Sequence, residues 1–212
     1  MIRAVFFDIG ETLVDESRSW LGWADWLGVP ALTFCSVLGA LIQRGEHHRQ
    51  VFDYFAPGVD PKDLWARRER EGWRYGFEPA DFYPDALPTL AALKAQGLVV
   101  GLAGNQPEEA EAALRKSGVA ADHIASSAGW GVEKPSPDFF ARILDVTGLP
   151  ADQIAYVGDR LDNDVIPALE AGMFAVFLMR GPWGVIQSEW PEAARAHAKI
   201  RALTDLPGVL GL

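Results

Sequence analysis

The chain has 212 residues, of which 49% are apolar and 23% are charged, and its formal net charge at pH 7 is −10. These proportions are ordinary for a folded globular protein and disfavour a disordered or fibrous chain. The acidic balance offers no positive field to a polyanion, so a nucleic-acid partner is not expected. The single cysteine, Cys35, cannot form an internal disulfide, which favours a reducing cytosol as the compartment.

An apolar run at residues 2–7 ends at Asp8. The run is too short for a signal peptide, and no later stretch approaches the length needed to cross a membrane. We therefore expect a cytoplasmic protein with no membrane partner. Because the run is apolar apart from Arg3 and stops at an acid followed closely by a glycine, residues 2–7 are predicted to form a strand buried on both faces of a parallel sheet.

The segment from residue 15 to residue 83 differs from the rest of the chain in its composition and hydrophobic pattern. Its pattern predicts helices at residues 31–44 and 61–71, the second with Asp60 as N-cap and Pro61 in the first helical position. The segment carries five tryptophans, which we expect to pack in a core rather than to form a ligand cage: Trp20, Trp23, Trp26, Trp65 and Trp73. A separate helical lobe, inserted after the first strand, is predicted.

Helical and apolar stretches alternate from about residue 88 onward. Helices are predicted at residues 89–96, 108–116, 138–147 and 163–171, and strands at residues 98–103, 124–125, 154–157 and 174–179. Residues 196–212 are predicted to add a last strand and helix. The alternation predicts an α/β fold in which helices cover both faces of a doubly wound parallel sheet.

Polar residues follow the predicted strands at the places where such sheets bind ligands, which are the carboxyl ends of the strands. Four short stretches stand there: Asp8-Ile9-Gly10-Glu11-Thr12, Gly104-Asn105, Glu133-Lys134-Pro135, and Gly158-Asp159 with Asp164 five residues later. Each alone is a common turn or helix-cap pattern. Their occurrence at successive ends favours a shared site on one edge of the sheet.

The chemistry of these residues indicates a divalent cation. Carboxylates that face each other cannot all stay ionised without a cation between them, and oxygen ligands suit Mg²⁺. Asp8 and Asp159 are the first candidates, and Asp164 is a further ligand, either directly or through water. Lys134 would place a positive charge beside the anionic groups. Substrate oxygens are expected to accept hydrogen bonds from three donors: the hydroxyl of Thr12 and the backbone amides of Gly104 and Asn105.

These stretches, in this order, resemble the four motifs of the haloacid dehalogenase-like (HAD) superfamily. The residues that carry the resemblance are Phe6-Phe7-Asp8-Ile9-Gly10-Glu11-Thr12-Leu13, Gly104-Asn105, Glu133-Lys134-Pro135-Ser136-Pro137-Asp138-Phe139-Phe140 and Val157-Gly158-Asp159-Arg160-Leu161-Asp162-Asn163-Asp164. The inserted lobe is similar to the helical C1 cap of that superfamily. The resemblance therefore implies a Rossmann-like core at residues 1–14 and 84–212 and a cap at residues 15–83.

The resemblance also implies a reaction. Asp8 would attack an electrophilic centre, commonly the phosphorus of a small phosphorylated metabolite, and water would then hydrolyse the aspartyl intermediate. It further implies that Mg²⁺ is held by Asp8, by the backbone carbonyl of Gly10 and by Asp159, with Asp164 in support. Lys134 would orient Asp8.

Two positions depart from the superfamily pattern. Gly10 stands where phosphatases of the superfamily usually carry the aspartate that protonates the leaving group, and Gly104 stands where they carry a serine or threonine. General acid–base catalysis is worth on the order of 10² to 10⁴ in rate. A phosphatase with these glycines is expected to be slow on esters with poor leaving groups.

Three explanations of the glycines remain open. The first is a substitute carboxylate, with Glu11 ahead of Asp15 and Glu16. The second is another bond type, such as carbon–halogen or carbon–phosphorus cleavage; the resemblance implies no metal for the former and a cap lysine for the latter, and the lobe has only Lys62. The third is a chain that has lost catalysis and binds a phosphorylated ligand or a protein.

Overall fold

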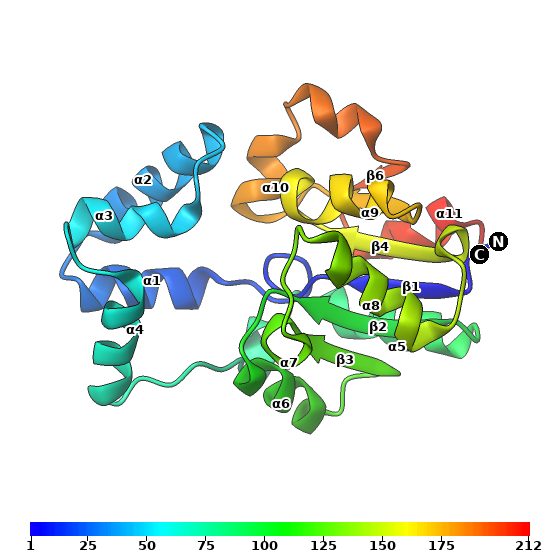
Figure 1. Cartoon of the computed structure of the whole chain (residues 1–212), viewed down its shortest axis with the longest axis horizontal. Coiled ribbons are helices and arrows are strands. Elements are labelled where there is room, and N and C mark those ends of the chain that lie inside the picture. The colour runs from blue at the N-terminus through cyan, green and yellow to red at the C-terminus, as the bar shows by residue number, and fades with distance from the viewer. The chain divides into compact units, whose positions relative to one another are not determined.

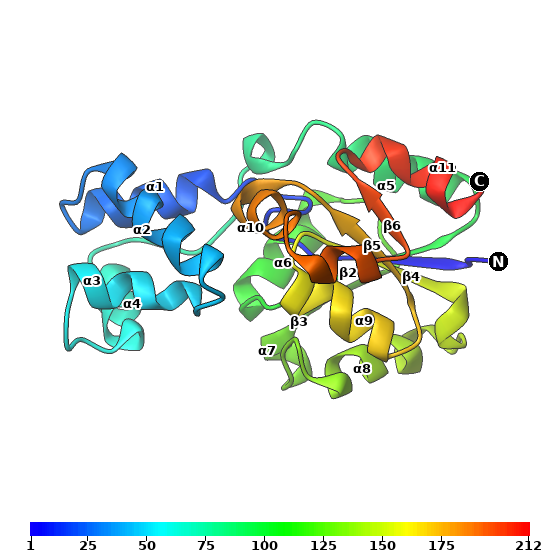
Figure 2. The same ribbon diagram turned by 90° about the horizontal axis from the view of Figure 1, so that it is seen from above.

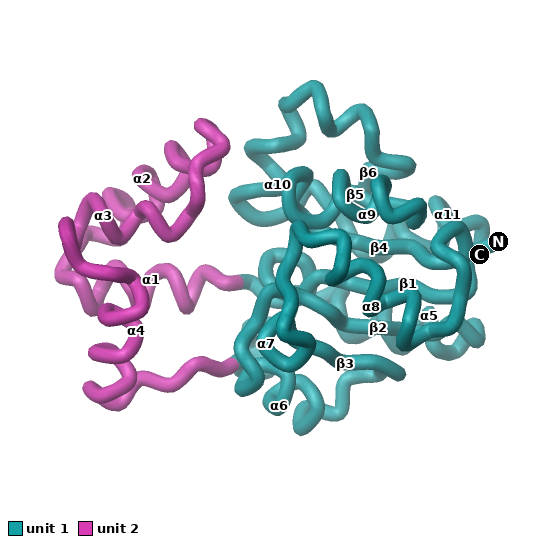
Figure 3. The backbone as a smooth tube through the Cα atoms, in the orientation of Figure 1, with its two compact units in different colours: residues 1–15, 77–212 teal, residues 16–76 magenta.

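The computed structural model describes all residues from 1 to 212 and divides them into two compact units (Figure 3). Residues 1–15 and 77–212 form the first unit, and residues 16–76 form the second. We expected the inserted lobe to end at residue 83, but residues 77–83 belong to the first unit. There Val14 forms an antiparallel bridge with Phe82, and the Tyr83 amide donates to the carbonyl of Leu13 at 2.9 Å.

The first unit is built on six parallel strands in the order β3-β2-β1-β4-β5-β6 (Figure 1). The strands are β1 Ala4–Phe7, β2 Val99–Gly104, β3 His123–Ser126, β4 Ile154–Gly158, β5 Phe174–Leu178 and β6 Ala198–Ile200. This confirms the predicted Rossmann-like, doubly wound sheet. The strand order reverses between β1 and β4, and open α/β sheets bind ligands at such a switch point.

Helices cover both faces of this sheet (Figure 2). They are α5 Ala86–Ala95, α6 Glu108–Ser117, α7 Ser127–Trp130, α8 Pro137–Thr147, α9 Ile166–Glu170, α10 Gly181–Gln187 and α11 Leu206–Leu210, with 3-10 turns at Pro79–Asp81, Ala151–Gln153, Pro191–Arg195 and Leu203–Asp205. Side chains of β1 alternate between the faces. Val5 and Phe7 pack with α5 and α11, whereas Ala4 and Phe6 pack with α8 and α9.

Two predicted helices differ from the structure near their prolines. The helix predicted at residues 163–171 is a π-helical turn, Leu161–Val165, followed by α9. Pro167 lies in the first turn of α9, where its missing N–H has no intrahelical partner to lose. Helix α5 begins at Ala86, earlier than predicted. Pro88 lies in its first turn, where a proline is tolerated, so the helix can begin before this residue. Helices α7 and α10 were not predicted.

The second unit is helical and has an aromatic core. Its helices are α1 Ser17–Trp26, α2 Ala31–Gln43, α3 Val51–Phe55 and α4 Pro61–Arg70, with a 3-10 turn at His48–Gln50. As predicted, Asp60 caps α4, its side chain accepting from the Lys62 amide at 2.8 Å. The ring of the buried Trp23 lies 4.8 Å from that of Phe52 and 5.1 Å from that of Trp65. These tryptophans pack against one another, as expected.

Helix α1 buries Trp23 and Ala24, and α2 buries Phe34, Leu38, Leu41 and Ile42. Neither these two helices nor any other single helix in the chain has the length and apolarity of a membrane-crossing segment. Taken together, α1 and α2 do meet those criteria, but a bend of 117° separates them.

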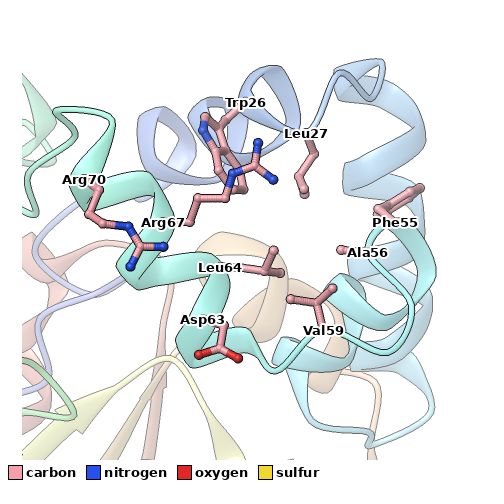
Figure 4. A pocket seen from close by; sticks show the side chains of 9 residues that line it. All are labelled: Trp26, Leu27, Phe55, Ala56, Val59, Asp63, Leu64, Arg67 and Arg70. Atoms are coloured by element: carbon pink, nitrogen blue, oxygen red, sulfur yellow. The ribbon is translucent and has the colours of Figure 1, made fainter.

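A hollow of about 440 Å³ opens among α1, α3 and α4 of the second unit (Figure 4). Its walls are mainly apolar, with charged side chains from α4 at the rim: Trp26, Leu27, Phe55, Ala56, Val59, Asp63, Leu64, Arg67 and Arg70. The guanidinium of Arg67 lies 5.2 Å from the centre of the Trp26 ring and donates through Nε to Glu71 at 3.0 Å. The Trp26 indole N–H donates to the same carboxylate at 2.6 Å, so this wall is held in place.

Candidate active site

Three carboxylates meet at the switch point of the sheet. Asp8 directly follows β1 and Asp159 directly follows β4, and these strands are neighbours, with Phe7 paired to Val157. Asp164 joins them from the π-helical turn. One oxygen of each carboxylate lies within 4.8 Å of one oxygen of the others, and all three residues are buried. The structure therefore brings together the three acids that the sequence singled out.

Lys134 lies among these acids with its side chain fully buried. Its ammonium nitrogen Nζ is 2.7 Å from Asp8 Oδ1 and 2.5 Å from Asp164 Oδ1. Burial alone would lower the pKa of Lys134, but the charges of Asp164 and Asp8 outweigh it and raise the pKa well above its ordinary value. Lys134 thus bridges two of the three carboxylates, and their charges favour its protonated form.

Asp159 has an oxygen with no partner, whereas both oxygens of Asp164 are bound. Asp164 Oδ1 accepts from Lys134, and Asp164 Oδ2 accepts from the Arg160 amide at 3.0 Å. Asp159 Oδ1 accepts from the Thr12 hydroxyl at 3.3 Å, but Asp159 Oδ2 is buried and has no hydrogen-bond partner. Buried polar atoms are nearly always paired. The unpaired oxygen is therefore a free ligand position.

The raised pKa of Asp159 also indicates a cation-binding position. Burial, together with the charges of Asp164, Asp8 and Glu11, raises the pKa of Asp159 well above its ordinary value. A divalent cation beside Asp159 Oδ2 would remove this penalty, and it would balance three carboxylates that face a single ammonium. The donor set consists of oxygens, which suits a hard ion such as Mg²⁺.

Thr12 and Asn105 hold other parts of the site in place. Thr12 is fully buried, and its hydroxyl orients Asp159. The Asn105 side chain binds the backbone of Lys134 twice, because its Nδ2 donates to the Lys134 carbonyl and its Oδ1 accepts from the Lys134 amide, each at 2.8 Å. The sequence predicted a role for the Asn105 backbone; this pairing of its side chain with the lysine loop was not predicted.

Gly104 lies so close to Asp8 that a side chain would disturb it. A Cβ atom at residue 104 would stand 2.5 Å from Asp8 Oδ1, the atom that Lys134 holds. We expect Gly104→Ala to displace this carboxylate and to lower kcat/KM on the order of 10²-fold, because a small misplacement of a reacting group has a large effect. Steady-state kinetics measure this. Gly208→Ala is the matched control, since nothing lies within 4 Å of that Cβ position, and equal kinetics for the two variants would contradict the expectation.

Glu11 is buried next to the three carboxylates in an unusual backbone conformation. Its φ is 52°, in the left-handed region that non-glycine residues rarely adopt. The Tyr83 hydroxyl donates to Glu11 Oε2 at 2.7 Å, and a Cβ at Gly181 would lie 2.5 Å from the same atom. Burial, followed by the hydrogen bond to Glu11, strongly raises the pKa of Tyr83. Glu11 is therefore held firmly, with its charge felt at Asp159.

Asp15 and Glu16, the other predicted substitutes, lie at the boundary of the two units. Asp15 ends the first segment of the first unit, where its amide donates to the Asp81 carbonyl at 2.8 Å. Glu16 begins the second unit, directly before α1. Of the three predicted carboxylates, Glu11 is the one that the structure buries beside the site.

Three further residues brace the loop between Asp8 and Leu13, and the sequence did not predict them: Tyr83, Asp85 and Arg180. Arg180, two residues beyond β5, donates to the Thr12 carbonyl at 3.1 Å and pairs with Asp85, and its guanidinium lies 4.2 Å from the centre of the Tyr83 ring. Asp85 also accepts from the Leu203 amide at 2.8 Å. Nothing in the local sequence pattern links these residues to Thr12.

Tyr156 is a fourth residue that the sequence did not single out. It lies inside β4 and is buried. Its hydroxyl donates to the Ala103 carbonyl at 2.8 Å, and the Lys134 ammonium lies 5.6 Å from its ring centre. A buried tyrosine needs a hydrogen-bond partner for its hydroxyl. A tyrosine within a predicted buried strand is therefore the sequence signal that could have indicated this contact.

Comparison with known proteins places this geometry in a family. The sequence profile of the haloacid dehalogenase-like hydrolases matches residues 2–172. A glyceraldehyde 3-phosphate phosphatase of Methanopyrus kandleri is 36% identical over 202 residues, which cover 86% of each chain. Its counterpart in Methanocaldococcus jannaschii is 37% identical over 105 residues, and that match spans about half of each protein, 48% of this chain and 46% of the relative.

Solved structures share the fold. The L-2-haloacid dehalogenase of Xanthobacter autotrophicus superposes with a TM-score of 0.70 at 20% identity, covering 100% of this chain and 99% of that one. The family profile covers most of the chain, and the acids of the first and fourth motifs lie together at the carboxyl ends of β1 and β4, with Lys134 of the third motif bound to Asp8 and Asp164. The chain therefore belongs to the haloacid dehalogenase-like hydrolase family.

Proposed function

We propose that this hydrolase is a Mg²⁺-dependent phosphatase that acts on a small phosphorylated metabolite through an aspartyl-phosphate at Asp8. The observation that carries the proposal is the buried group of three carboxylates with an unpartnered oxygen on Asp159 and a lysine on Asp8. The relatives named as glyceraldehyde 3-phosphate phosphatases support the substrate class. In this proposal residues 16–76 serve as the C1 cap.

The residues present fit a magnesium ion. Asp8, the backbone carbonyl of Gly10 and Asp159 would hold it, and Asp164 would support the site through its bonds to Lys134 and to the Arg160 amide. When bound, Mg²⁺ supplies charge stabilisation to the phosphoryl oxygens. The absence of a side chain at Gly10 does not remove the carbonyl.

The chain's own groups account for the transfer of the phosphoryl group. An Asp8 oxygen attacks phosphorus, the bond from phosphorus to the ester oxygen breaks, and the leaving oxygen takes a proton from solvent water, because Gly10 supplies no acid. Lys134 orients Asp8, and the amides of Gly104, the last residue of β2, and of Asn105 would donate to the phosphoryl group. Water then cleaves the aspartyl-phosphate. Thr12 acts through Asp159, which it orients.

The leaving group tests this proposal, because Gly10 provides no acid. We expect aryl and acyl phosphates to be hydrolysed faster than alkyl phosphates, since their leaving oxygens need little protonation. Gly10→Asp is expected to raise kcat for glycerol phosphate by about 10²-fold or more and to change kcat for p-nitrophenyl phosphate much less. Steady-state rates on the two esters measure both effects.

Glu11→Gln is the comparison variant for this test. If Glu11 serves as the acid, Glu11→Gln lowers the rate on glycerol phosphate selectively; if Glu11 only fixes the loop and the charge at Asp159, both esters change in parallel. An unchanged ratio of the two rates in Gly10→Asp would contradict the assignment of the missing acid to residue 10.

Cleavage of a carbon–halogen or a carbon–phosphorus bond would give different experimental results. Halide released from a 2-haloacid without added metal would contradict the phosphatase proposal and favour a dehalogenase. Phosphonate cleavage requires a lysine that forms a Schiff base, and Lys62 is an exposed residue at the start of α4. A chain that neither binds Mg²⁺ in calorimetry nor becomes phosphorylated at Asp8 would favour a binding protein.

A further inference from the structure

We propose that Gln187 is a positioning residue that fixes the metal-binding turn carrying Asp159 and Asp164. This inference rests on the proposed function, since it concerns the affinity of the site for Mg²⁺. Gln187 is the last residue of α10, lies outside the four motifs, and is only 2% exposed. A polar side chain buried to this degree requires partners for both its oxygen and its nitrogen.

Both partners of Gln187 belong to the turn. Its Oε1 accepts from the Leu161 amide at 2.7 Å, and its Nε2 donates to Asp162 Oδ1 at 3.2 Å. Leu161 begins the π-helical turn, and the first amides of a helical turn have no partner within it. Gln187 therefore caps this turn from another part of the chain.

The turn that Gln187 caps determines where two of the three acids lie. Asp159 stands two residues before Leu161, and Asp164 stands three residues after it. Asp164 reaches back to accept from the Arg160 amide, and the amides of Asp164 and Val165 both donate to the Arg160 carbonyl, at 3.0 and 3.1 Å. A shift of the backbone at residues 160–161 would thus move both carboxylates together.

Helix α10 holds the backbone of Gln187 in a fixed position. A Cβ at Gly184 would stand 2.6 Å from the carbonyl oxygen of Leu178, so the helix lies directly on the end of β5. The guanidinium of Arg160 in turn lies 5.3 Å from the centre of the Trp183 ring and pairs with Asp162 at 2.6 Å. The turn is therefore clamped to a helix that is itself packed against the sheet.

Removing the amide of Gln187 tests the proposal. Gln187→Met keeps the length of the side chain and removes both hydrogen bonds, and we expect it to weaken Mg²⁺ binding by about 10-fold to 100-fold, as is usual when a group that orients metal ligands is lost. Isothermal titration of the full chain with MgCl₂ measures the dissociation constant without any substrate. In kinetics, the Mg²⁺ concentration for half-maximal rate should rise by the same factor, while kcat at saturating Mg²⁺ changes less.

Two further variants keep the test decisive. Gln187→Asn is too short to reach the Leu161 amide and should weaken Mg²⁺ binding as Gln187→Met does, even if the methionine variant folds poorly. Gln187→Glu retains an oxygen for the Leu161 amide and should recover part of the affinity. Gln153→Met is the matched control, because Gln153 accepts from Arg3 at the opposite, exposed end of β4.

The outcomes separate this inference from the proposed function. Wild-type affinity for Mg²⁺ in folded Gln187→Met and Gln187→Asn would overturn the inference and leave the phosphatase proposal intact. Equal weakening in Gln153→Met would also overturn it, since the effect would then not be specific to the turn. A wild-type chain that binds no Mg²⁺ would overturn the proposed function and this inference together.

Discussion

Asp8→Asn is expected to lower kcat on any phosphate ester by at least about 10³-fold, because an amide cannot act as the nucleophile that forms the aspartyl-phosphate. The carboxylate lies at the end of β1, 2.7 Å from the Lys134 ammonium, and is largely buried. The substitution keeps the shape of the side chain and removes one negative charge from an excess of carboxylates. We therefore expect the variant to stay folded.

A matched control for Asp8→Asn is Asp145→Asn, which makes the same chemical change at an exposed position on α8. Steady-state rates with p-nitrophenyl phosphate, together with circular dichroism of both variants, separate lost chemistry from lost structure. Turnover by Asp8→Asn within a few-fold of the wild type would contradict the role of Asp8 as nucleophile.

Lys134→Met is expected to damage both stability and activity. The ammonium is fully buried between Asp8 and Asp164, and removing one partner of a buried ion pair typically costs about 3 to 5 kcal/mol. Activity is expected to fall by about 10²-fold or more, because Asp8 loses the group that orients it. Urea unfolding measures the first effect and steady-state kinetics the second.

The control for Lys134→Met is Lys94→Met. Lys94 pairs with Asp122 at the surface, with about a third of each side chain exposed, and such pairs contribute only about 0 to 1 kcal/mol. If the two variants lost equal amounts of unfolding free energy, the buried bridge at Lys134 would not stabilise the fold as argued.

The stability deficit of Lys134→Met should also depend on pH. Burial raises the pKa of Asp164 to about 6 although Lys134 opposes the rise, so loss of the lysine raises this pKa further. A carboxyl whose pKa is raised on folding stabilises the fold below its unfolded pKa, and this contribution is lost as the pH rises through the folded pKa. The deficit relative to wild type is therefore expected to be smaller at about pH 5 than at about pH 8.

The architecture was predictable because it follows from local patterns that repeat along the chain. Apolar runs ending in polar residues gave the strands that carry Asp8 and Asp159, and the parallel topology then requires their carboxyl ends to meet. The doubly wound sheet was confirmed for this reason. The predicted lobe boundary at residue 83 lies seven residues beyond the end of the second compact unit at residue 76, because the bridge from Val14 to Phe82 joins residues 77–83 to the first unit.

The parts of the site that the sequence did not predict depend on contacts between distant segments. Gln187 ends a short helix that contains a proline and two glycines, and these residues obscure the helical pattern. Arg180 reaches the Thr12 carbonyl across 168 residues, and no periodicity reports such a bond. The contact of Gly104 with Asp8 likewise appears only when β1 and β2 are paired. Short-range patterns thus located the acids, and long-range packing determines how they are held.

The proposed function requires Asp8 to accept a phosphoryl group. Mixing the protein with acetyl phosphate and Mg²⁺, quenching in acid and mapping peptides by mass spectrometry tests it directly. We expect one added phosphoryl group on Asp8, which accumulates because Gly10 leaves the second step without a general base. A protein that stays unmodified at Asp8, or that is modified equally in Asp8→Asn, would contradict it.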